Sequence, residues 1–204
     1  MAETANTSPF DPAGFSEGGG LWDGKIVTIT AAHFGLQTDN EGRPFINPDT
    51  KQPSDGHGLI VKGVAEGEEK ERREQYSMGA LKATADGESV CKSDGSAGSL
   101  HKASNAGKFF EALTASGFDM NRIYVNGQGR VSGLVGAKIE FVGVSKLGKD
   151  GKVVIKKGFE SKTFFPRKTV GYLTGVTGGN GSVAATTLVE KGRKIVAELL
   201  TAAG

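Results

Sequence analysis

Three residue types are scarce in this chain of 204 residues: it has one cysteine, Cys91, one tryptophan and three histidines. A single thiol supports no internal disulfide and no cysteine-based zinc site, which fits a reducing compartment. No stretch approaches the ~18 consecutive apolar residues of a membrane span. Residues 1–9 lack the basic start and apolar centre of a secretory signal. We therefore expect no membrane partner and a cytoplasmic location.

Signatures of catalysis and of cofactor binding are missing as well. His33, His57 and His101 form no metal-binding pair at helical spacing, and no Gly-x-Ser-x-Gly turn is present. Residues 143–150 nearly match a phosphate-binding loop, but Asp150 stands where Ser or Thr would bind magnesium. A strand is also expected there in place of the helix that would hold phosphate. We expect no enzyme activity, no cofactor and no metal.

Glycine is what the chain has in excess. There are 32 glycines in 204 residues, more than twice the usual share of ~7%. Hydrophobic residues still make up 37%, which is enough for a packed core. Many glycines between short apolar runs indicate a mainly β protein with many turns.

The patterns predict five strands and a central helix. Alternation and β-branched residues place the strands, in chain order, at residues 25–34, 59–64, 74–78, 138–144 and 152–165. The last strand contains Gly158 as a bend, and Pro166 indicates that it ends there or lies at a sheet edge. The predicted helix covers residues 104–116, with Ser104 as its cap and Gly117 just past its end.

The chain divides into four predicted parts. Residues 1–20 are a flexible arm, residues 21–170 the folded domain and residues 171–186 a glycine-rich linker. Residues 187–204 hold an amphipathic helix, in which Thr187 and Glu190 form a capping box. A helix this short is marginal alone, so it either docks back on the domain or binds a partner. That partner would be a second copy of the chain or a replication protein.

The predicted order, three strands, a helix and two strands, is that of an OB-fold. This is a five-stranded Greek-key barrel that often binds single strands of nucleic acid. The long loop at residues 35–58, between the first two strands, and the final hairpin would be its binding loops. A Lys-Asp-Gly-Lys turn at residues 149–152 joins the two strands of that hairpin.

Positive charge gathers in this final hairpin. Residues 146–168 carry eight basic and two acidic side chains, a net charge of +6, whereas the whole chain has +2. Phenylalanines alternate with these cations. Lysine and arginine neutralise phosphates, and exposed rings stack on bases. The alternative is a solvated, lysine-bearing edge strand that resists aggregation.

At this point the sequence resembles the divergent single-stranded DNA-binding proteins of bacteriophages. The resemblance covers residues 22–170. The short stretches that carry it are residues 75–79 (Gln-Tyr-Ser-Met-Gly), the helix with Phe118, the Leu134-x-Gly136 approach to the fourth strand, the turn at 149–152, and residues 164–166 (Phe-Phe-Pro). One departure is that the chain lacks the acidic tail with which bacterial single-strand binders recruit partners.

The resemblance implies a protein that coats single-stranded DNA with little sequence preference during phage replication or recombination, in the host cytoplasm. Backbone contacts would come from basic side chains at Lys25, Lys156, Lys157, Lys162, Arg167 and Lys168. Base stacking would come from rings at Trp22, Phe34, Tyr76 and Phe159. Two other classes stay open: a virion structural protein that self-assembles, and an adaptor that binds a replication partner.

Overall fold

The computed structural model describes residues 22–47, 50–125, 128–148, 150–156 and 158–173. The expected arm and C-terminal helix lie outside these residues. The long strands are β1 (Ile26–Leu36), β2 (His57–Ala65), β3 (Arg72–Ser77), β8 (Ala137–Ser145) and β11 (Lys162–Tyr172). They form one antiparallel sheet in the order β11-β8-β1-β2-β3. The expectation of a mainly β protein is confirmed.

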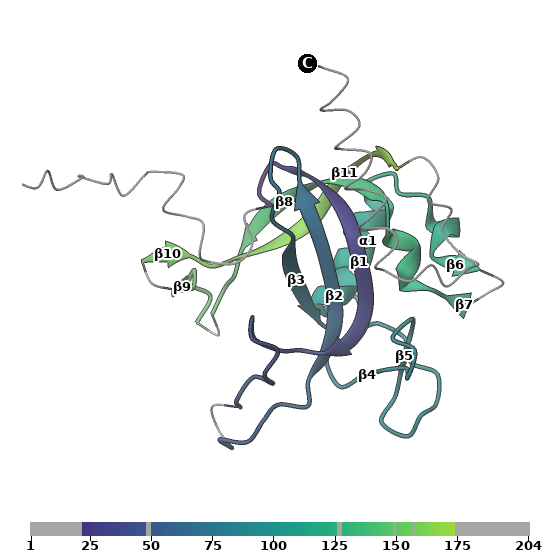
Figure 1. The fold of residues 1–204 in the computed structure, drawn as a ribbon. Coiled ribbons are helices and arrows are strands. Elements are labelled where there is room, and N and C mark those ends of the chain that lie inside the picture. Colours follow the sequence, from purple (N-terminus) through teal and green to yellow (C-terminus); the bar gives the residue numbers. More distant parts are fainter. Residues whose placement is uncertain (1–21, 48–49, 126–127, 149, 157, 174–204) are drawn as a thin grey trace, which may run out of the picture.

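Shorter elements connect these strands. The α-helix α1 (Asn105–Ala115) lies between β3 and β8, as expected. The remaining elements are pairs of two-residue strands and two short 3₁₀ helices: β4 (Lys82–Ala83), β5 (Val90–Cys91), η2 (Met120–Arg122), β6 (Tyr124–Val125), β7 (Gln128–Gly129), η3 (Val131–Leu134), β9 (Ile155–Lys156) and β10 (Phe159–Glu160). Figure 1 shows α1 behind the sheet and the β9–β10 pair projecting away from it.

The start of α1 follows directly from its sequence. The Ser104 hydroxyl accepts a hydrogen bond from the Gly107 amide at 3.0 Å, which satisfies one of the free amides of the first turn. Gly117 follows the helix with φ +81°, a conformation that glycine adopts without strain. Phe109 and Leu113, four residues apart on one side of α1, project into the core and are fully buried.

The sheet does not close into the expected barrel. The strands β3 and β11 are both edges of the sheet, with no ladder between them among the described residues. Other contacts bridge this seam: the Tyr76 hydroxyl donates to the Phe164 carbonyl at 2.5 Å, and the Phe109 ring of α1 lies 4.7 Å from the Tyr76 ring. Large side chains thus take the place of backbone pairing, and the closed-barrel prediction is wrong.

The end of the sheet differs from the expectation in two more ways. The strand predicted at residues 152–165 is broken, because Gly158 has φ +81° in the small β9–β10 turn. The strand β11 then begins at Lys162 and continues through Pro166 to Tyr172. Pro166 fits because β11 is an edge strand, as expected, and a bulge follows it. Gly171 and Tyr172, assigned to the linker, therefore belong to the sheet.

Candidate nucleic-acid interface

The outer face of β1, β2 and β3 carries three basic side chains, His33, Lys62 and Arg73. Strand neighbours such as Ala32, Val61 and Tyr76 point into the core, so alternation turns His33, Lys62 and Arg73 outward. Lys62 pairs with Arg73 in the register of β2 and β3. The pKa of His33 is lowered, first by partial burial and then by the positive charges of Lys62 and Arg73. Two carboxylates oppose this charge: Glu88 acts to raise the pKa of His33, and Glu71 pairs with Lys62 at 3.7 Å, so the positive charge of this face is partly balanced.

The loop between β1 and β2, residues 37–56, is fixed to this face at its base. The Arg73 guanidinium donates to the Thr38 carbonyl at 3.1 Å and to the Asp39 carbonyl. The Gln75 amide group both donates to the Thr38 carbonyl, at 2.7 Å, and accepts from the Thr38 amide, at 3.1 Å. These bonds hold the loop against β3. Further out the loop exposes Phe45, whose exposed fraction is 46%.

The second flank is the projecting hairpin, which we define as residues 146–161. The Val154 amide donates to the Lys146 carbonyl at 2.8 Å, and the Lys146 amide donates to the Ser161 carbonyl at 2.7 Å. The predicted turn is confirmed by Gly151, which has φ +74° and donates to the Gly148 carbonyl at 3.0 Å. The hairpin is therefore ordered by backbone bonds outside the main sheet.

The projecting hairpin exposes both apolar and basic side chains. Phe159 is 57% exposed, and three aliphatic side chains on the same hairpin are also exposed: Leu147, Val153 and Ile155. Lys146 and Lys152 are exposed beside them. In Figure 1 this hairpin and the loop at residues 37–56 leave the sheet toward the left and lower left, while β6–β7 lie on the right. Each flank thus offers one exposed phenylalanine.

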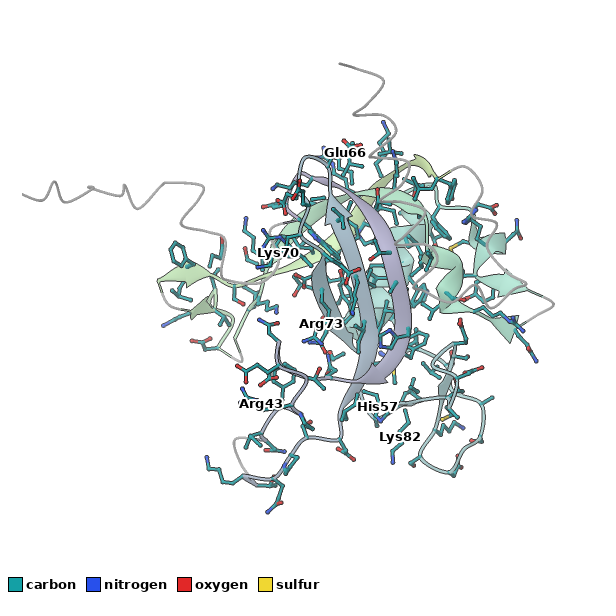
Figure 2. All side chains as sticks on the ribbon, in the orientation of Figure 1. Arg43, His57, Glu66, Lys70, Arg73 and Lys82 are labelled. Atoms are coloured by element: carbon teal, nitrogen blue, oxygen red, sulfur yellow. The ribbon has the colours of Figure 1, made fainter. Side chains whose placement is uncertain are left out.

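Further basic side chains lie between the sheet and the loop at residues 37–56, as Figure 2 shows. Lys70, Arg73 and Arg43 follow one another down the face of the sheet toward the loop at residues 37–56. Lys70 is exposed, whereas the Arg43 guanidinium pairs with Asp39 at 2.8 Å and with Glu41 at 2.6 Å. One guanidinium against two carboxylates leaves this part of the loop with a net charge of −1. The positive charge beside it lies on Lys70, Arg73 and the projecting hairpin.

Three of the four proposed stacking residues belong to the core. Trp22, Phe34 and Tyr76 are buried. The Trp22 ring packs on Phe141 at 4.8 Å. A base cannot stack on a ring whose faces are covered by protein, so these three residues are withdrawn from the site. Phe159 keeps an exposed ring and stays a candidate.

The proposed phosphate contacts divide into three groups. Lys25, Lys162 and Arg167 are each ion-paired, with Glu68, Asp23 and Glu140 respectively, so a phosphate would have to compete with a carboxylate. Lys168 is exposed on β11. The side chain of Lys156 and the whole of Lys157 lie outside the described residues. The structure brings together Lys162 and Phe159 near the projecting hairpin, but Lys25 lies with Glu68, beside the β2–β3 turn.

Sequence reasoning missed Phe45, His33, Lys62 and Arg73. Phe45 had a signal, because an aromatic residue in a long, proline-rich loop has few core neighbours available. Lys62 and Arg73 follow the alternation of β2 and β3. The face of His33 could not be predicted, because it depends on the bulge between Ile29 and Ala31 in β1.

Glu74 on β3 has a pKa well above that of an ordinary carboxyl group. It lies on the inward face of β3, two residues from Tyr76, at the seam near the base of the projecting hairpin. Burial raises its pKa to about 7, and the positive charge of Lys146 opposes that rise. No hydrogen bond to its carboxyl group is found among the described residues. Glu74 thus titrates near neutral pH beside the proposed interface.

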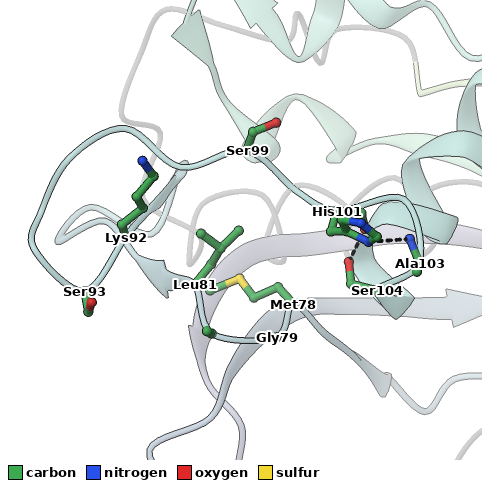
Figure 3. A pocket seen from close by; sticks show the side chains of 10 residues that line it. Met78, Gly79, Leu81, Lys92, Ser93, Ser99, His101, Ala103 and Ser104 are labelled. Carbon is green, nitrogen blue, oxygen red and sulfur yellow. Dashed lines mark hydrogen bonds between the residues drawn. The ribbon is translucent and has the colours of Figure 1, made fainter.

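Other hollows give no sign of catalysis. The pocket in Figure 3 has a volume of about 600 Å³ and lies between residues 78–81, 92–93 and the start of α1. Its histidine is structural: the His101 Nδ1 accepts from the Ala103 amide at 3.1 Å, and the His101 carbonyl accepts from the Ser104 hydroxyl at 2.7 Å. Within the described ranges no group of three or more His, Cys, Asp or Glu side chains could hold a metal.

Comparison of the chain with protein-family models, with curated proteins and with solved structures gives no match. Among the helices that the structure describes, none is both long and apolar enough to cross a membrane.

Proposed function

We propose that this protein binds single-stranded DNA with little sequence preference, across the outer face of β1, β2 and β3. The observation that carries the proposal is the pair of exposed phenylalanines, Phe45 and Phe159, on the two segments that flank this face. In OB-folds the corresponding loops and strands bind oligonucleotides, and the strand order here supports the same use.

Each part of the interface has a role in this proposal. Phe45 and Phe159 stack on bases, which is possible only where base faces are unpaired, so a single strand is favoured over a duplex. Arg73 and Lys146 neutralise the backbone between the two rings and release counterions. Lys62 can do the same only in competition with Glu71, with which it pairs at 3.7 Å. No side chain is asked to read base edges, and little sequence preference follows.

The test is fluorescence anisotropy with a labelled single strand of ~30 nucleotides, compared with a duplex of equal length at two salt concentrations. We expect tighter binding to the single strand and an affinity that falls steeply with salt. Replacing both phenylalanines, Phe45→Ala with Phe159→Ala, should weaken binding by roughly 2–6 kcal/mol in total, at ~1–3 kcal/mol per ring.

The chain offers matched controls for both kinds of contact. Tyr124 is as exposed as Phe159, at 58%, but lies on β6, so Tyr124→Ala should leave affinity unchanged. Lys152→Glu should weaken binding and reduce the salt slope, whereas Lys108→Glu on α1 should do neither. Equal effects of Phe159→Ala and Tyr124→Ala would remove the projecting hairpin from the interface.

A specific observation favours a second function, self-assembly as a structural protein. Leu147, Val153 and Ile155 are exposed on one hairpin, and neighbouring exposed apolar side chains mark protein contacts. Sedimentation of the DNA-free protein separates the two: a stable oligomer that Ile155→Asp dissolves, together with no DNA binding at low salt, would replace our proposal with this one.

A further inference from the structure

A second hollow is a cleft on the other flank of the molecule. Its volume is about 1090 Å³, and its walls come from residues 84–102, from α1 and from residues 120–131. Apolar side chains form much of its lining, including Leu100, Phe110, Met120, Ile123 and Tyr124. In Figure 1 the β4–β5 and β6–β7 pairs around it lie to the right, away from the projecting hairpin.

The last described residues of the chain are anchored beside this cleft. The Tyr172 hydroxyl accepts from the Asp119 amide at 2.8 Å, and the Arg122 guanidinium lies 4.3 Å from the centre of the Tyr172 ring. Asp119 directly precedes Met120, a wall residue of the cleft. The Leu173 amide then donates to the Gly136 carbonyl at 2.8 Å. The chain thus leaves the described domain at the cleft's edge.

The sequence after Leu173 contains an apolar stripe that could fill an apolar cleft. Among residues 174–204, five apolar side chains recur at helical spacing: Leu188, Ile195, Val196, Leu199 and Leu200. Fourteen residues, 174–187, separate Leu173 from the first of them, and a fully extended chain of that length reaches about 46 Å. This distance exceeds the diameter of a domain of this size, ~30–40 Å, so every part of the cleft is within reach.

Charge at the cleft has the sign opposite to that of this segment. The cleft is lined by three carboxylates, Asp86, Glu88 and Glu111, and by two cations, Lys102 and Arg130. The segment carries three cations, Lys191, Arg193 and Lys194, and two carboxylates, Glu190 and Glu198.

We infer that residues 187–200 dock through their apolar stripe into this cleft of the same chain. The short tether gives the segment a high effective concentration at the cleft, which favours its own chain over a second copy. Docking covers Leu100, Phe110 and Tyr124 and leaves the opposite face of the molecule free.

Cys91 is a built-in probe, because it is the sole cysteine and a wall residue of the cleft. We would measure how fast a maleimide alkylates Cys91 in the full chain. Ile195→Asp with Leu199→Asp disrupts the stripe and should speed the reaction at least about tenfold, as expected if the segment is docked ~90% of the time. Ala197→Asp with Thr201→Asp adds the same two negative charges to the opposite helical face and should leave the rate unchanged.

A cross-link gives an independent readout. Glu198→Cys and Leu200→Cys each place a cysteine at one border of the stripe. Under mild oxidation this cysteine should form a disulfide with Cys91 of the same chain. The cysteine of Ala197→Cys, on the opposite face, should not. Equal alkylation rates in all variants would overturn the inference. Protection that depends on protein concentration, with dimers linked by disulfides, would overturn it in favour of a second copy. Neither result depends on whether the protein binds DNA.

Discussion

The seam between β3 and β11 and the projecting hairpin are neighbours rich in aromatic and aliphatic side chains, yet they differ in exposure. At the seam, Tyr76 and Phe109 are fully buried and Phe164 nearly so, whereas on the hairpin Phe159 and Ile155 are more than half exposed. Removal of a ring should therefore reduce the free energy of unfolding at the seam and reduce binding at the hairpin. Composition is similar in both regions, and packing separates their roles.

The sharpest comparison is Phe109→Ala against Phe159→Ala. The Phe109 ring lies between Tyr76, at 4.7 Å, and Phe110, at 5.6 Å, and its loss should lower the free energy of unfolding by roughly 3–5 kcal/mol. Phe159→Ala should change it by less than about 0.5 kcal/mol, as for other exposed positions. Denaturant unfolding measures both, and a large loss in the second variant would mean that the hairpin packs on the core.

Glu74 lies where the two regions meet, and it predicts a pH dependence. Its pKa is about 7 in the folded chain, against an ordinary value of 4.5, so the folded state holds a proton that the unfolded state has lost. The contribution of Glu74 to the free energy of unfolding is fully present below about pH 4.5 and is lost as the pH rises through 7. Glu74→Gln should remove that slope and raise the free energy of unfolding at pH 8 by roughly 3 kcal/mol, the equivalent of the difference between the two pKa values.

Unfolding curves at pH 5 and pH 8 provide this measurement. Glu111→Gln on α1 is the control for the loss of one negative charge from an exposed position. If the Glu74→Gln variant keeps the slope of the unmodified chain, then Lys146 holds the Glu74 carboxyl group ionised and the seam is not pH-sensitive.

Tyr76→Phe isolates the bond that bridges the seam. The change removes the hydroxyl that donates to the Phe164 carbonyl and leaves that buried carbonyl without its partner, at a cost of about 1–3 kcal/mol. The ring contacts with Phe109 and Phe165 remain. Amide hydrogen exchange in β11 should rise more than in β1, and equal rises in both strands would show that the seam opens only with the whole sheet.

The smallest effect is expected for the exposed ion pair between Asp23 and Lys162. The Lys162 ammonium and the Gly143 amide hold the pKa of Asp23 below its usual range, so the stability it adds is lost as the pH falls through that lowered value. Solvent screens the pair, and Asp23→Asn should cost no more than about 0.5–1 kcal/mol at neutral pH. A larger loss would mark the pair as a structural clamp between β8 and β11.

Much of the element order could be predicted from local patterns. The first strand, the helix with its Ser104 cap and the turn with Gly151 follow from alternation, helical spacing and glycine, which act over a few residues. The break in the strand predicted at residues 152–165 could not be predicted, because the apolar residues of this stretch suit a sheet edge as well as an exposed hairpin. Trp22 and Tyr76 were misassigned for a related reason: an aromatic ring has the same sequence signature in a core and on a binding face.

The sequence by itself determined the class of fold, the order of its strands and helix, the long first loop and the basic final hairpin, because these depend on short-range propensity and charge. Only the tertiary structure decided that the sheet stays open at β3 and β11, that Glu74 is partly buried at this seam, and that Phe45 and Phe159 are exposed. These features depend on which distant segments pack together, and that choice is made by shape and burial over the whole chain.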